Sequence, residues 1–172
     1  MTQASLLLFF VSLERGAELV VARQNTRRLL AQGGVESGSA HYPLIVLVHA
    51  AWLAGLWAWG WNQPLNSLWL AVFLCLQGLR IWVLATLGRR WTTRIITVPG
   101  ERLVASGPYK YFPHPNYLVV VGEIASLPLC LGLPGVALVF SALNAAILYI
   151  RIKAESAALA GASTREARAT NE

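Results

Sequence analysis

The chain has 172 residues and a net charge of +6, with 56% hydrophobic residues and only 13% charged residues. Soluble domains usually contain about 25% charged residues, so this composition excludes an ordinary soluble domain and predicts an integral membrane protein. A chain of this length is expected to form one domain, and residues 1–10 lack the basic region of a cleavable signal peptide.

Apolar stretches long enough to cross a bilayer recur along the chain. They cover residues 4–22, 43–61, 65–87 and 116–152. Gly132-Leu133-Pro134 divides the last stretch into two shorter helices. The sequence therefore predicts an all-α integral membrane protein with about five transmembrane helices, the last two forming a short hairpin.

The distribution of basic residues predicts the orientation of these helices. Twelve of the 14 Lys and Arg residues lie in 23–42, in 88–115 and from 151 onward, all on one side of a five-helix arrangement. The positive-inside rule assigns this side to the cytoplasm, which places the N-terminus outside and the C-terminus in the cytoplasm. Anionic lipid headgroups account for the positive charge, so membrane lipids are the expected partners and nucleic acid is not.

Several ionisable residues fall inside the predicted spans, where an unpaired charge costs several kcal/mol. They are Glu14, Arg15, Glu18, His49, Arg80 and Glu123. We expect Arg15 or Arg80 to pair with the acids and to lock the first helix to the third. His49 is expected to be an interhelical donor rather than a ligand. For Glu123, a structural hydrogen bond and a role in a site both stay open.

Two cysteines, Cys75 and Cys130, lie within apolar stretches. Neither has a partner at the spacing of metal ligands, so we expect packed thiols, no disulfide and no metal site. Residues 157–172 are small and polar, and we expect them to form a fraying or disordered cytoplasmic tail.

The connection at 88–115, "GRRWTTRIITVPGERLVASGPYKYFPHP", is too long for a simple loop in so compact a protein. Pro115 suits the first position of a helix, and His114 before it is held extended. The following helix then starts with free N–H groups, which can bind an anion such as a carboxylate. An interfacial loop with aromatic residues among the headgroups is the alternative.

The last helix carries a second polar pair, Arg151 and Glu155, which share a face at i and i+4. Together with the His-Pro motif, "LVASGPYKYFPHPNYLVVVGEIASLPL" and "RIKAE" resemble the isoprenylcysteine carboxyl methyltransferase family of integral membrane enzymes. The resemblance covers residues 80–156. The segments "LERGAELVVARQN" and "HYPLIVLVH" look like a bacterial branch of this family, some members of which accompany type III polyketide synthases.

The resemblance implies one membrane-embedded methyltransferase domain over 1–156, in the bacterial inner membrane, with a cytoplasmic cofactor loop at 88–115. It implies S-adenosylmethionine as cofactor and Arg151 as the residue facing the acceptor. It implies cofactor contacts from Glu101, Arg102, Leu103, Val104, Tyr109, His114, Pro115, Asn116, Tyr117 and Glu155, with Arg94 a looser match. Two positions depart from the family pattern: Pro113 replaces a basic residue, and Ser156 stands where many members have an acid.

A membrane site suits an acceptor with a long lipid tail, either a polyketide enol or phenol or a prenylcysteine carboxylate. A carboxylate or an acidic enol is already a nucleophile at neutral pH. A phenol, with a pKa of about 10, needs a base, for which Glu123 is the candidate. The competing hypothesis is a non-enzymatic membrane scaffold or small transporter. The absence of inverted-repeat symmetry and the gathering of polar residues at one end of the helices argue against it.

Overall fold

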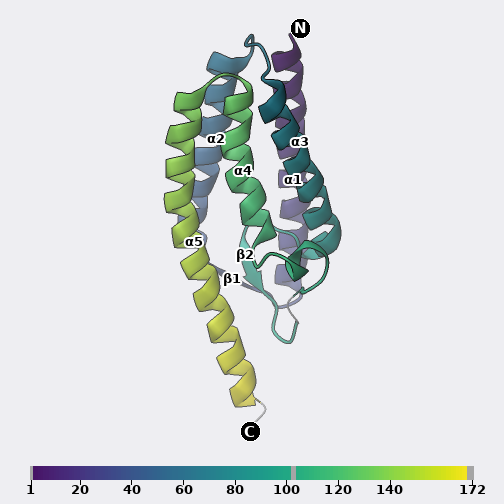
Figure 1. Cartoon of the computed structure of the whole chain (residues 1–172). Helices are drawn as coiled ribbons and strands as arrows, with labels where there is room; N and C mark the ends of the chain where they lie inside the picture. The colour runs from purple at the N-terminus through teal and green to yellow at the C-terminus, as the bar shows by residue number, and fades with distance from the viewer. Residues whose placement is uncertain (1, 102–103, 170–172) are drawn as a thin grey trace.

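A computed structural model describes residues 2–101 and 104–169 of the chain, with side chains described up to residue 157. Five helices run alternately up and down along one bundle, so that the N-terminus and the two tight hairpins lie at the same end (Figure 1). The helices are α1 (Gln3–Ala31), α2 (Tyr42–Gly60), α3 (Ser67–Leu87), α4 (Pro115–Cys130) and α5 (Pro134–Ala169). The predicted five-helix architecture and the α4–α5 hairpin are confirmed.

Local sequence signals explain where several helices begin. The hydroxyl of Thr2 accepts a hydrogen bond from the Ser5 amide, and the side chain of Asn66 accepts from the Leu68 and Trp69 amides. These side chains satisfy N–H groups that have no partner within the helix. α1 is longer than the predicted span, because the helix continues past residue 22 into the basic region and ends at Ala31.

Three of the described helices are long and apolar enough to cross a membrane. They occupy Ser39–Gly60, Ser67–Arg90 and Pro134–Ala157. α4 is apolar but has only 16 residues, which span about 24 Å at 1.5 Å per residue. α1 carries Glu14, Arg15 and Glu18 in its middle. The helical composition and these spans make the chain an integral membrane protein.

The main apolar core lies in the half of the bundle that contains the hairpins. It is formed by buried residues of α1, α2, α3 and α4 and of the α4–α5 turn: Ala4, Leu8, Val11, Trp52, Leu56, Phe73, Ile124, Leu127 and Leu131. α3 and α4 pack closely, since a Cβ at Gly122 would lie 2.6 Å from Leu76 Cδ1. This close approach brings the neighbouring residue, Glu123, against α3.

A short antiparallel sheet, which the sequence did not predict, joins the two connections at the other end. β1 (Val35–Ser37) pairs with β2 (Ile95–Thr97), with Glu36 opposite Ile96. Three residues are too few to show an alternating pattern, so this pairing depends on contacts made by the folded bundle. The short helices η1 (Ser39–His41), η2 (Gly88–Arg90) and η3 (Gly107–Lys110) complete this end.

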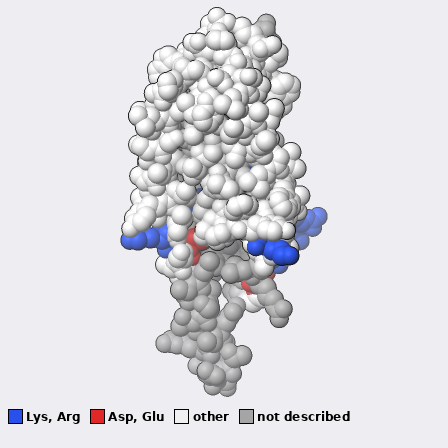
Figure 2. Space-filling model, viewed as in Figure 1, with Lys and Arg blue, Asp and Glu red and all other residues white. Residues whose placement is uncertain are grey.

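Lys and Arg side chains gather at the end of the bundle that holds the sheet (Figure 2). The Asn25 amide fastens the long connection to α1 here, because it donates to the carbonyl oxygens of Gly88 (3.2 Å) and Trp91 (2.8 Å). α5 extends beyond this end to Ala169, into the segment for which the sequence predicts a polar tail. The disorder of that tail stays a prediction.

Candidate active site

The start of α4 is held at the basic end of the bundle by the turn that precedes it. Gly107 adopts a φ of +57°, and a Cβ there would lie 2.3 Å from the Thr86 hydroxyl. Only glycine meets both requirements without strain, so this residue seats η3 against α3. His114 then occupies the N-cap of α4 without a side-chain capping bond, and Pro115 is the first helical residue.

A chain of hydrogen bonds links α4 to α5 beside this start. The Tyr117 hydroxyl donates to the Glu155 carboxylate, and Arg151 Nε donates to the same hydroxyl at 3.0 Å. Arg151 Nη1 donates to the Thr93 carbonyl at 2.8 Å, which ties α5 to the long connection. The His114 ring stacks on the Tyr117 ring with 5.3 Å between centroids.

Tyr109 lies close enough to Glu155 for the charge of the carboxylate to act on the Tyr109 hydroxyl. Burial, with the negative charge of Glu155 adding to it, raises the pKa of Tyr109 to about 12. An acid with a raised pKa keeps its proton at physiological pH. Tyr109 is therefore a neutral hydrogen-bond donor at the edge of this group.

A largely apolar cavity of about 300 Å³ begins at Arg151 and Tyr117 and runs into the bundle. A volume of this size is at the lower end of the range for small-molecule sites. The residues that line it come from all five helices and the long connection: Arg15, Glu18, Leu19, Tyr42, Ile45, Val46, His49, Ala50, Trp52, Leu53, Arg80, Trp91, Thr92, Thr93, Asn116, Tyr117, Val120, Asn144, Ile147, Leu148 and Arg151.

The inner wall of this cavity is bounded by a buried network of charges. Arg80 donates to Glu18 at 2.9 Å and through two nitrogens to Glu123, at 2.7 Å from Nε. Arg15 lies 2.9 Å from Glu18 and 3.5 Å from Glu123. The predicted locking of the first helix to the third is confirmed, and Glu123 extends the network to α4. Gln77 adds a hydrogen bond to Glu123 at 2.8 Å.

Comparison with known proteins identifies the family of this chain. Residues 69–161 match the model of the isoprenylcysteine carboxyl methyltransferase family. The chain belongs to this family. It is 42% identical to the uncharacterized protein YpbQ of Bacillus subtilis over 159 residues, which are 90% of this chain and 95% of the relative. An uncharacterized protein of Haemophilus influenzae is 28% identical over 147 residues, which are 82% of this chain and 86% of the relative. No solved structure matches the chain.

Membership in the isoprenylcysteine carboxyl methyltransferase family makes the protein a membrane methyltransferase, and methyltransferases of this family use S-adenosylmethionine. The matched residues include α4, α5 as far as residue 161, and the connection before α4. α1 and α2 lie outside the matched residues, yet they supply Arg15, Glu18, Tyr42 and His49 to the cavity wall.

The structure brings together only part of the cofactor set that the family resemblance implies. At the basic end, the start of α4 lies beside α5 and brings together His114, Pro115, Asn116, Tyr117 and Glu155. Tyr109 is near them. The Glu101 carboxylate pairs with Arg90 at 2.6 Å, and the structure records no bond between it and these residues among those it describes. Val104 is half-buried, and Arg102 and Leu103 fall outside the described residues.

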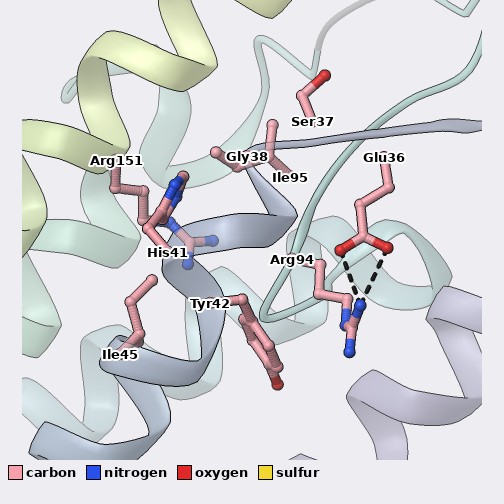
Figure 3. Close-up of a pocket in the computed structure, with 9 residues that line it drawn as sticks. All are labelled: Glu36, Ser37, Gly38, His41, Tyr42, Ile45, Arg94, Ile95 and Arg151. Carbon is pink, nitrogen blue, oxygen red and sulfur yellow. Dashed lines mark hydrogen bonds and ion pairs between the residues drawn. The ribbon is translucent and has the colours of Figure 1, made fainter.

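Arg94 also has its own partners. Its guanidinium donates to both carboxylate oxygens of Glu36, at 2.7 and 3.0 Å, and lies over the Tyr42 ring. Figure 3 shows this pair beside the sheet, with Arg151 reaching the same small pocket from α5. Arg94 therefore braces the long connection against the segment before α2.

Sequence reasoning missed two polar residues of the site. Tyr42 bonds the Thr93 hydroxyl at 3.0 Å, and Asn144 lies buried in the cavity wall within the apolar run of α5. A polar residue in a transmembrane run that lacks an obvious partner is the signal that would have indicated Asn144. Nothing in the sequence pairs Tyr42 with Thr93, since 51 residues separate them.

Proposed function

We propose that the protein is an S-adenosylmethionine-dependent O-methyltransferase whose acceptor has a polar head at Arg151 and a lipid tail in the membrane. The observation that carries the proposal is the cavity, which starts at the hydrogen-bond chain of Arg151, Tyr117 and Glu155 and continues between apolar walls. Its lining includes Leu19 of α1 and Val46 of α2, which are 50% and 42% exposed. A tail can thus enter sideways between α1 and α2.

The residues where the start of α4 meets α5 fit the chemistry of the cofactor. Glu155 offers a carboxylate to an ammonium group or to ribose hydroxyls. The uncapped start of α4, with the Asn116 amide, suits the cofactor's carboxylate. The stacked rings of His114 and Tyr117 offer an aromatic surface. When bound, S-adenosylmethionine supplies an electrophilic methyl group, and the protein aligns the acceptor oxygen and excludes water.

Arg151 is the residue we assign to the acceptor. An anionic oxygen in a region of low dielectric constant needs a positive partner, and a guanidinium supplies one with directed donors. A polyketide enol or phenol and a prenylcysteine carboxylate both present such an oxygen. Of these we propose the polyketide enol, with a functional link to a type III polyketide synthase.

Glu123 fits a structural role better than the role of a base. Both of its oxygens are engaged by Arg80, and it is absent from the described lining of the cavity. A carboxylate whose two oxygens both accept hydrogen bonds from a guanidinium presents no free oxygen to take a proton from the acceptor. We therefore propose that the acceptor is one that ionises without help from a base.

The cofactor site is tested by binding of S-adenosylhomocysteine to purified protein in detergent. We expect His114→Ala and Glu155→Ala each to weaken this binding roughly ten- to a hundredfold, because a hydrogen bond to a charged group contributes about 1.5–3 kcal/mol. Calorimetry measures the affinity, with Glu101→Ala as the control because Glu101 pairs with Arg90. Unchanged affinity in folded samples of both variants would place the cofactor elsewhere, and no binding by the wild type would favour a scaffold or transporter.

Five spans with the N-terminus outside put this site at the cytoplasmic face. In a background of Cys75→Ala and Cys130→Ala, a cysteine at Asn62 is expected to react with a membrane-impermeant reagent added to intact cells. Cysteines at Arg94 and Ser163 are expected to react only after the cells are opened. The reverse pattern of labelling would invert the topology and refute a cytoplasmic site.

A further inference from the structure

A polar residue without a partner lies deep in the cavity. Asn144 is only 4% exposed, lines the cavity, and its amide has no hydrogen-bond partner among the described residues. A buried amide is unfavourable in an apolar environment unless it is hydrogen-bonded, and in a transmembrane segment few alternatives are available. The arrangement therefore points to a group that occupies the cavity and bonds Asn144.

His49 presents a second unused group to the same space. Its Nδ1 lies 2.8 Å from the Ile45 carbonyl oxygen, which can only accept, so Nδ1 carries the proton. In the neutral ring Nε2 is then an acceptor, and it has no partner in the described part of the chain. His49 belongs to the lining of the cavity.

Helix geometry puts these two residues within about 3 Å of the same level along the axis of the bundle. α2 and α5 are antiparallel neighbours (Figure 1), and a Cβ at Gly55 would lie 3.9 Å from the Phe140 ring. From that contact His49 is six residues and Asn144 four residues toward the basic end, or about 9 and 6 Å along the axes at 1.5 Å per residue.

This level is separated from the level of Arg151. Asn144 precedes Arg151 by seven residues, so both lie on the same face of α5, about 10 Å apart along its axis. The lining residues between them on this face are the apolar Ile147 and Leu148. Arg15, Glu18 and Arg80 also line the cavity, and they bond one another and Glu123. In the described part of the chain none of the three bonds Asn144 or His49.

We propose that Asn144 and His49 form a second recognition site for the acceptor, which binds a hydroxyl group on the tail about two helical turns from the methylated oxygen. A hydroxyl is the group that fits, because it can donate to His49 Nε2 while it accepts from the Asn144 amide. A purely hydrocarbon tail would leave both groups unsatisfied. This site rests on the proposed function and adds a requirement on the structure of the acceptor.

The test uses a long-chain 4-hydroxy-pyrone and a series of analogues in which one hydroxyl is moved along the tail. We expect kcat/KM for the wild type to peak, roughly tenfold or more above the unsubstituted pyrone, when the hydroxyl lies about 10 Å from the enol oxygen. Asn144→Leu and His49→Phe should each abolish this peak, measured as the ratio of kcat/KM values. Binding of S-adenosylhomocysteine identifies the samples that are folded.

Ser126→Ala is the matched control. Ser126 is a buried polar residue of α4 without a hydrogen-bond partner, but it does not belong to the described lining of the cavity. This variant should retain the peak. Equal kcat/KM values along the whole series in the wild type, with the pyrone still methylated, would overturn the second site and leave the proposed function standing; ordered water would then satisfy Asn144 and His49. No methyl transfer to any analogue would overturn the proposed function itself.

Discussion

Replacement of Arg151 by alanine is expected to lower methyl transfer by about two orders of magnitude, which corresponds to an increase of about 2.7 kcal/mol in the activation free energy. The guanidinium stands where the cavity begins, and its Nη2 has no partner among the described residues. An oxygen that develops or carries charge there would lose its positive partner. The measurement is turnover of a lipid-tailed enol, beside that of a prenylcysteine.

Cofactor affinity is expected to change much less in this variant. The Tyr117 hydroxyl donates a hydrogen bond to Glu155, and the His114 ring stacks on the Tyr117 ring. Neither contact requires Arg151. We expect S-adenosylhomocysteine affinity to stay within about threefold, a change of about 0.7 kcal/mol or less. If Arg151→Ala lost cofactor binding and turnover together, Arg151 would belong to the cofactor site.

Two further variants sharpen this division of roles. Arg151→Lys should recover only part of the activity, because an ammonium lacks the two-pronged geometry of a guanidinium. Lys153→Ala is the matched control, since it removes a positive charge from the same end of α5. Lys153 is exposed, stacks on the Tyr149 ring, and is not among the residues that line either cavity. Its removal should leave turnover close to that of the wild type.

The parts of this structure that could be predicted from sequence are those that local patterns determine. Apolar length set the number of helices, and Pro115 and Pro134 marked where α4 and α5 begin. The i, i+4 spacing of Arg151 and Glu155 predicted that they share one face of α5. The structure confirms this, since both bond the same α4 residue, Tyr117.

The parts that could not be predicted depend on how the long connection folds back. Arg94 carries the charge expected of a cofactor ligand, but its nearest acid, Glu36, is brought to it by a sheet of three-residue strands. Glu101 likewise found a partner in Arg90. Neither pair has the spacing of neighbours on one helix or strand, so these contacts leave no periodic signal in the sequence.

The buried network of Arg15, Glu18, Arg80 and Glu123 leads to the second large effect. Arg80→Met is expected to reduce the free energy of unfolding by about 3–5 kcal/mol, because Arg15 then remains as one cation for the two carboxylates of Glu18 and Glu123. The side chains of Arg80 and Glu123 are only 4% and 6% exposed, so bulk water cannot hydrate the excess negative charge as it would at the surface. The loss of unfolding free energy is measured by titration with sodium dodecyl sulfate in mixed micelles, with far-UV circular dichroism as the signal for unfolding. Cys75→Ala, an exposed change on the same helix, is the control.

Pairwise removal separates the effect of charge from the effect of lost hydrogen bonds. The four residues carry two positive and two negative charges, so Arg80→Met with Glu123→Met leaves Arg15 and Glu18 as a neutral pair, 2.9 Å apart. The double variant should therefore regain most of the stability that Arg80→Met loses. Interhelical hydrogen bonds in membrane proteins average only about 0.6 kcal/mol. If hydrogen bonds alone contributed, each single variant would lose little stability, and the double variant would lose the sum of the two losses. A double variant less stable than either single variant would support that view and would show that charge balance does not hold α1, α3 and α4 together.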